Sequence, residues 1–226
     1  MSGLFNSSIG RKLVMSISGL FLVLFLLFHM SMNMVVVFSS EAYNAVCGFL
    51  GTNWYALAGT AVLALGMIVH IVYAFILSYQ NRKARGNDRY EVTAKPKTVE
   101  WASQNMLVLG IIVVLGIALH LSHFWYKMMF AELAGIEGEF APTDGAAFVK
   151  FTFEQPLNVV LYLVWFVALW FHLTHGFWSA LQTIGWNNNV WIDRLKCISF
   201  WYSTIVCGAF AVIVLGFYAG VFPLFG

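Results

Sequence analysis

Long apolar segments alternate with short polar ones along this chain. Five segments of more than 20 residues contain no Asp, Glu, Lys or Arg: Leu13–Phe38, Trp54–Gln80, Gln104–Tyr126, Pro156–Gly185 and Cys197–Pro223. A helix needs roughly 20 residues to cross a hydrocarbon core of about 30 Å, and lipid offers no partners for an open sheet. The pattern therefore predicts an all-α integral membrane protein, residues 1–226 forming one domain with five transmembrane helices.

Composition supports this prediction. The chain is 61% hydrophobic and 10% charged, against about 45–50% and about 25% in soluble domains. This excludes an ordinary soluble enzyme and a disordered protein, and the net charge of +2 argues against nucleic-acid binding. The three cysteines form no CxxC or CxxCH motif, so neither an iron–sulfur cluster nor a covalently attached haem is expected.

Loop charge predicts the orientation in the membrane. Ten cations fall in the N-terminal tail and in the second and fourth loops: Arg11, Lys12, Arg82, Lys83, Arg85, Arg89, Lys95, Lys97, Arg194 and Lys196. Only Lys127 and Lys150 fall on the other side. By the positive-inside rule the N-terminus is cytoplasmic and the C-terminus extracytoplasmic.

The apolar run after Lys12 is too long for a cleaved signal peptide, so we expect a retained span. The loop from about Ala131 to Gln155 is expected to form an extracytoplasmic cap.

All six histidines lie in the predicted spans: His29, His70, His120, His123, His172 and His175. Ionisable residues inside a membrane are costly and usually functional, although a neutral histidine can also simply hydrogen-bond between helices. At 1.5 Å per residue, His29 and His120 each lie roughly 24 Å from the cytoplasmic end of their spans. By the same measure His70 and His175 each lie roughly 15 Å from it.

Two histidines at equal depth on facing helices can hold one planar cofactor between them. The depths therefore predict two haems, the outer held by His29 and His120, the inner by His70 and His175. His123 and His172 each lie three residues from a proposed ligand and share its helix face. They are alternatives as ligands, or contacts for a haem propionate or a quinone, or packed residues; level-matching favours His120 and His175 as ligands.

At these residues the sequence resembles a known family, the di-haem cytochrome b anchors of succinate:quinone oxidoreductases and fumarate reductases. It is most similar to the single-polypeptide, five-helix type of menaquinone-using bacteria. The resemblance covers nearly the whole chain and rests on the order and spacing of several motifs: Ser18-Gly19, His29-Met-Ser-Met-Asn33, His70 followed by Asn81-Arg82-Lys83-Ala84-Arg85, Trp101-Ala102-Ser103-Gln104-Asn105-Met106, His120-Leu121 and His175-Gly176-Phe177-Trp178-Ser179.

The resemblance implies two non-covalent b haems, ligated by one histidine on each of the first four helices, and its His-Gly step marks His175 as the fourth ligand. It implies a multi-pass protein of the bacterial cytoplasmic membrane. Such a subunit anchors a flavoprotein and an iron–sulfur protein on the cytoplasmic side and passes electrons to (mena)quinone, performing no succinate chemistry itself. A dimer of the complex is left open. Some relatives carry a glutamate just before the fourth ligand, but Leu173 and Thr174 stand here.

Other polar residues are expected beside the cofactors. Those near the cytoplasmic ends are candidate propionate partners: Arg11, Lys12, Ser16, Arg82, Trp101 and Ser103. Candidate haem or quinone contacts are Asn33, His123, His172 and Gln182.

Two other functions compete with this one. The first is a di-haem cytochrome b of a nitrate reductase or hydrogenase, and the second is a non-redox transporter or scaffold, which would usually show intramembrane acids or broken spans.

Overall fold

The computed structural model describes residues 7–85, 101–186 and 188–222 of the chain, and these are helical with short connections. Five helical segments are long and apolar enough to cross a membrane: Ser8–Val37, Trp54–Ala84, Met106–Ala134, Pro156–Thr183 and Ile192–Tyr218. The predicted number of spans and the multi-pass membrane class are therefore confirmed. Of the residues used to predict the ends and the charge pattern, Arg89, Lys95, Lys97 and Pro223 lie outside the described residues.

The first span is α1 (Ser8–Met34), which continues through the short 3-10 turn η2 (Val35–Val37). It is followed by α2 (Ser40–Thr52) and by the second span, α3 (Trp54–Arg85). A short helix, α4 (Trp101–Gln104), precedes α5 (Met106–His120), whose helix runs on through the wider π-helical η3 (Leu121–Phe130) and α6 (Ala131–Ala134). After α7 (Gly145–Phe153) come the last two spans, α8 (Pro156–Thr183) and α9 (Ile192–Tyr218).

Local capping explains several of these boundaries. The Ser7 hydroxyl accepts from the backbone of Gly10 at the start of α1, and Ser39 accepts from Ala42 at the start of α2. The Asp144 carboxylate accepts from Ala147 at the start of α7. Each side chain satisfies a backbone N–H that has no partner within the helix. Pro156 stands in the first turn of α8, where its missing N–H costs nothing.

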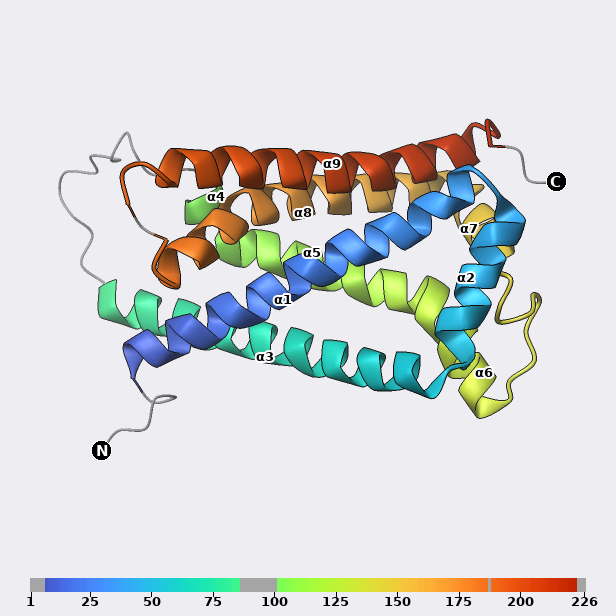
Figure 1. Cartoon of the computed structure of the whole chain (residues 1–226), viewed down its shortest axis with the longest axis horizontal. Coiled ribbons are helices and arrows are strands. Elements are labelled where there is room, and N and C mark those ends of the chain that lie inside the picture. Colours follow the sequence, from blue (N-terminus) through green and yellow to red (C-terminus); the bar gives the residue numbers. More distant parts are fainter. Residues whose placement is uncertain (1–6, 86–100, 187, 223–226) are drawn as a thin grey trace.

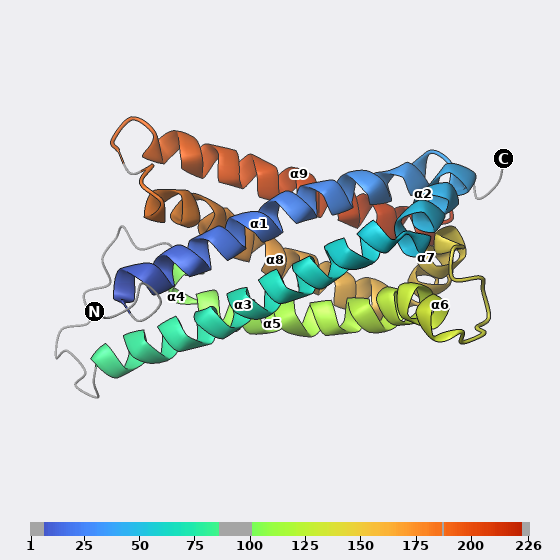
Figure 2. The same cartoon turned by 60° about the horizontal axis from the view of Figure 1, so that its bottom comes forward.

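The five long helices run roughly along one axis (Figures 1 and 2). At one end lie the start of α1, the end of α3, α4, the end of α8 and the start of α9; we call this the basic end, because Arg11, Lys12 and Arg82 lie there. At the other end lie α2, α6 and α7, which we call the cap end. Most of the predicted cap segment is α6, α7 and their connection, whereas α2 was not predicted from the sequence.

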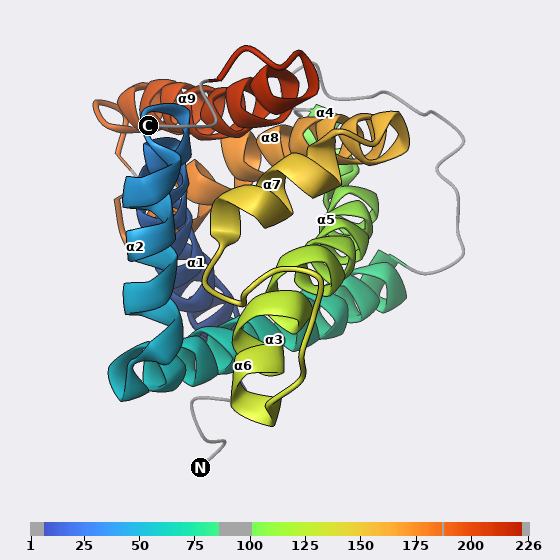
Figure 3. The ribbon, with the colours of Figure 1, turned by 90° about the vertical axis from the view of Figure 1, so that its right-hand side faces the viewer.

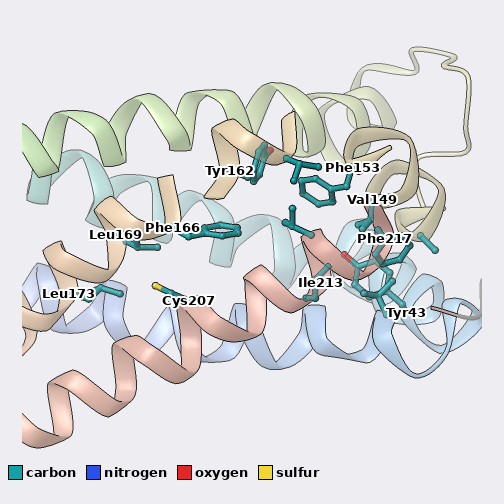
Figure 4. Packing of buried hydrophobic residues seen from close by; sticks show 14 of the residues in the cluster. Tyr43, Val149, Phe153, Tyr162, Phe166, Leu169, Leu173, Cys207, Ile213 and Phe217 are labelled. Atoms are coloured by element: carbon teal, nitrogen blue, oxygen red, sulfur yellow. The ribbon is translucent and has the colours of Figure 1, made fainter. Parts of the chain in front are cut away.

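Four helices form a ring. Within the described residues α1 packs on α3, α3 on α5, α5 on α8, and α8 on α1 (Figure 3). Helix α9 lies outside this ring against α8 and α1. The best-packed side chains gather between α8, α9 and α7, including Tyr162, Phe166 and Phe217 (Figure 4). By contrast, no described side chain of α3 is fully buried.

Candidate functional site

The histidines lie on the two diagonals of the four-helix ring. In this ring α1 stands opposite α5, and α3 stands opposite α8; neither opposite pair is closely packed along its described backbone. His29 of α1 contacts His120 of α5, and His70 of α3 contacts His172 of α8. The two contacts therefore cross the interior of the ring, where a cofactor of a helix bundle is held.

The pair nearer the cap end is His29 with His120. Their ring centroids lie 5.7 Å apart and their planes are nearly perpendicular, at 84°. Phe25 stacks on His29 at 5.3 Å, while Phe124 and Trp165 lie 5.1 and 5.9 Å from the His120 ring. Aromatic side chains thus surround both imidazoles, and both remain half-buried.

The pair nearer the basic end is His70 with His172, whose centroids lie 6.4 Å apart at 76°. The Ser18 hydroxyl donates to the carbonyl of Met15 at 3.0 Å and lies 3.2 Å from Nδ1 of His70. The direction of the contact between Ser18 and His70 depends on the tautomer of the imidazole. In the tautomer that donates from Nδ1 to the Ser18 oxygen, Nε2 keeps the lone pair that a metal requires.

Close packing of α1 on α3 gives His70 this neighbour. A Cβ atom at Gly19 would lie 3.1 Å from Cε1 of His70, so a larger residue there would press on the ring. Ser18 and His29 are separated by 11 residues of α1, or roughly 16 Å along the helix axis at 1.5 Å per residue. The two histidine pairs consequently occupy two distinct levels.

The α8 histidines differ in their surroundings. Nδ1 of His172 is buried without a hydrogen-bond partner among the described residues, which is an unfavourable state for an imidazole nitrogen. His175 lies one turn nearer the basic end, with its ring edge-on to Trp178 at 5.0 Å. The Lys196 amine lies over that same indole at 4.8 Å. Thus His172, and not the predicted His175, is in ring contact with His70, while both stay on the same part of α8.

His123 forms a separate pair with Tyr162 of α8. Its Nδ1 lies 3.2 Å from the tyrosine hydroxyl, and the two rings are nearly parallel at 5.9 Å. Tyr162 also contacts His120, at 6.4 Å. His120 and His123 therefore both face α8, as their three-residue spacing predicts, although the helix between them changes to the wider π form. Such π segments are frequent at functional sites.

The predicted propionate partners are spread along the basic end. Ser16 is buried and Ser103 half-buried, whereas Lys12 and Arg82 are exposed; Arg11 is half-buried on the first turns of α1. Trp101 is exposed but contacts Phe171, the neighbour of His172, at 5.1 Å.

Lys12 and Gln182 line a common cavity of about 360 Å³ between α1 and α8. Arg82 lies 12 residues beyond His70, or roughly 18 Å along α3, which places it at the end of its span.

A polar chain reaches His29 from the cap end. The Tyr43 hydroxyl of α2 donates to the Asn33 side-chain oxygen at 2.8 Å, and the Asn33 amide donates to the His29 carbonyl at 2.8 Å. Burial, reinforced by the neighbouring Cys47 thiol, raises the pKa of Tyr43 well above its ordinary value. Its hydroxyl consequently stays protonated and able to donate at neutral pH.

Sequence reasoning did not assign a role to Ser18, Tyr43, Tyr162 or Trp165. Trp165 occupies the space beside Gly116 and donates from its indole nitrogen to the Val113 carbonyl at 3.1 Å, joining α8 to α5. The Ser18-Gly19 step was a usable signal for a residue beside a ligand, because small residues permit close helix approach. Tyr43 offered no such signal, because its partner depends on how α2 docks.

The donor set suits a planar macrocycle better than a bare ion. Among the described residues no group of three or more His, Cys, Asp or Glu side chains could enclose a metal. The chain supplies two pairs of facing imidazoles instead, with ring centroids 5.7 and 6.4 Å apart, and imidazole is a haem-iron ligand. The buried Nδ1 of His172 has no hydrogen-bond partner among the described residues, and Ser18 lies within hydrogen-bond distance of Nδ1 of His70, as an orienting neighbour of a ligand would. These residues therefore fit haem.

Comparison of the chain with protein-family models, with curated proteins and with solved structures gives no match.

Proposed function

We propose that this chain is a di-haem cytochrome b, serving as the membrane anchor and electron-transfer subunit of a succinate:quinone oxidoreductase or fumarate reductase. The observation that carries the cytochrome assignment is the placement of two histidine pairs on the two diagonals of one four-helix ring, at two levels. A bundle with histidines only as packing residues has no need for such an arrangement.

His29 with His120 would hold the outer haem. His70 would hold the inner haem together with a histidine of α8. The resemblance favours His175 for that position, whereas ring contact and the unpartnered Nδ1 favour His172. When bound, a haem supplies one-electron transfer, and its potential is tuned by axial ligation, burial and hydrogen bonding.

The chain's own residues orient the imidazoles and exclude water. Ser18 would hold His70 through its contact with Nδ1, and the ring of Phe25 packs on His29. Trp165 draws α8 and α5 together beside His120. The basic end carries Arg11, Lys12 and Arg82, cations that would meet the propionates and dock an iron–sulfur partner.

The succinate and quinone parts of the proposal rest on the motifs around these histidines. By this proposal the basic end faces the cytoplasm, the flavoprotein and iron–sulfur subunits dock there, and quinone exchanges with the haems inside the membrane.

The test is affinity purification of the chain from the membrane of its own cells. We expect a complex with two further subunits, one carrying flavin and one carrying iron–sulfur clusters, and succinate-dependent reduction of b-type haem. A di-haem chain that purifies with a nitrate reductase or hydrogenase partner instead would keep the cytochrome assignment and overturn the succinate one. A colourless chain would favour the transporter or scaffold.

A further inference from the structure

The cap end is connected to His29 through hydrogen-bonding side chains from two helices. Tyr43 lies in α2, outside the spans, and its hydroxyl donates to Oδ1 of Asn33 at 2.8 Å. The amide nitrogen of Asn33 donates to the His29 carbonyl at 2.8 Å and lies 3.4 Å from both ring nitrogens of His29. The last two distances are too long for strong hydrogen bonds. The amide nitrogen therefore lies in contact with the His29 ring and limits its rotation by steric hindrance.

The Asn33 amide is held at both ends, because its nitrogen and its oxygen each make a bond of normal length. It cannot swing away from the imidazole without losing one of them. Rotation of the His29 ring is therefore restricted by a group whose position depends on Tyr43.

Tyr43 is itself held firmly by α7. It is 7% exposed, and a Cβ atom at Gly145 would lie 2.9 Å from its ring and closer still to Sγ of Cys47. The Asn44 amide next to it donates to Asp144 at 2.8 Å and accepts from the backbone of Ala146 at 2.9 Å. Helices α2 and α7 thus form one unit, which fixes the tyrosine.

His70 is held in a different way. Its Nδ1 contact is Ser18, inside the spans and 11 residues of α1 away from His29. A change at the cap therefore has a direct path to the cap-end histidine pair, whereas the other pair is held by α1 itself.

We infer that Tyr43 and Asn33 are positioning residues for His29, through which the α2–α7 cap sets the orientation of one axial imidazole. This inference rests on the proposed function, since the imidazole is taken to be a haem ligand. It predicts that the cap tunes the outer haem and leaves the inner haem unchanged.

The test is Tyr43→Phe in the purified complex, with Tyr126→Phe as the matched control, since Tyr126 is an exposed tyrosine at the same end. Three quantities are measured: haem per chain, the two midpoint potentials in a redox titration, and the low-spin signals in electron paramagnetic resonance, which respond to axial imidazole orientation. We expect two haems in both variants. In Tyr43→Phe one potential and one low-spin signal should shift, and in Tyr126→Phe neither should.

Two further variants make the result specific. Gly145→Ala displaces Tyr43 while keeping its hydroxyl, and should move the same haem signal as Tyr43→Phe. Ser18→Ala removes the contact of His70 and should move the other one. If the Tyr43→Phe complex does not assemble, Gly145→Ala tests the same effect of the cap on the outer haem.

The inference is overturned if the cap variants retain both haems and leave both potentials and both signals at their wild-type values. It is also overturned if they move both haems equally, which would indicate a general loss of structure. If the wild-type complex contains no b haem, the proposed function fails first; wild-type haem with unresponsive cap variants leaves that function standing and removes this inference alone.

Discussion

At the scale of single residues, the structure separates ligand candidates from the groups that hold them. His70 illustrates this most clearly, because the Ser18 oxygen lies 3.2 Å from its Nδ1, and a proton held there would leave Nε2 free for a metal. Partners of this kind orient a ligating histidine and raise its basicity, and their loss typically costs 10–100-fold in metal affinity or activity.

We therefore predict that Ser18→Ala weakens binding of the inner haem by roughly 10–100-fold, measured as haem retained per chain during titration with a haem-scavenging apoprotein. Ser31→Ala is the control, because Ser31 lies on the same helix and donates only to its own helix, at the Leu27 carbonyl. Equal haem retention in the two variants would contradict the role of Ser18.

The fourth ligand can be decided by substitution. His29→Ala or His120→Ala should each remove one haem, and His70→Ala should remove the other. Among the α8 histidines, only one of His172→Ala and His175→Ala should remove the same haem as His70→Ala, as measured by pyridine haemochrome and by the spectrum that remains. If every one of these variants kept both haems, the paired-histidine interpretation would be wrong.

A thiol at the cap end gives a pH-dependent prediction. Burial raises the pKa of Cys47 to about 11, so at pH 8 about one thiol in a thousand is ionised. In a chain with Cys197→Ala and Cys207→Ala, alkylation of Cys47 should be slow at pH 8 and rise about tenfold per pH unit toward pH 11. Only the thiolate reacts, so a rate already at its plateau at pH 8 would contradict the buried state.

At the scale of elements, the long helices could be predicted from sequence but the cap could not. A charge-free run of more than 20 residues has few alternatives to a spanning helix. The α2 segment is only 13 residues long, too short to cross a membrane, and contains Glu41 and Asn44, so a search for long charge-free runs does not find it. Its helix depends on the Ser39 cap and on docking against α7, which only the folded structure shows.

The histidine pairing could be predicted only in part, for a similar reason. Depth along each span brings His29 to the level of His120, and these residues are in contact. His172 and His175 share one helix face and differ by roughly 4.5 Å in depth. A small tilt or shift of the helix changes the depth of a residue by as much. Sequence spacing alone therefore cannot choose between them, and in the structure it is the ring of His172 that contacts His70.

The contact between α2 and α7 should be the main support of the cap. Asn44→Ala removes one hydrogen bond of Asp144, which keeps its bond from Ala147, and leaves the buried backbone N–H of Ala146 without its side-chain partner, at a cost of about 1–3 kcal/mol for a buried group. We expect faster proteolysis and faster hydrogen exchange over α2 and α7, with α8 and α9 unchanged. Asn188→Ala is the control, because its side chain caps only the exposed connection before α9. Protection of α2 equal to wild type would show that the cap is held elsewhere.

At the scale of the whole molecule, an uneven distribution of charge accompanies the ring of four helices. Ten of the twelve Lys and Arg residues belong to the tail and loops at one side of the predicted spans, from which we predict that the basic end faces the cytoplasm. Partners that deliver electrons would meet the ring at that end, closest to the level of His70.

Orientation can be tested by cysteine labelling in a cysteine-free background. Asn189→Cys at the basic end and Glu137→Cys at the cap end both replace exposed residues. A membrane-impermeant maleimide should label Glu137→Cys in spheroplasts and Asn189→Cys only in inverted vesicles. The reverse pattern would place the basic end outside and exclude cytoplasmic partners.

The central claim is that this ring binds two haems, and the most direct measurement is a dithionite-reduced minus oxidised spectrum with haem quantified per chain. We expect a b-type spectrum and two haems per chain, lost one at a time when His29 or His70 is replaced. A folded chain that takes up no haem when supplied with it would contradict the proposed cytochrome and leave a histidine-bearing transporter or scaffold.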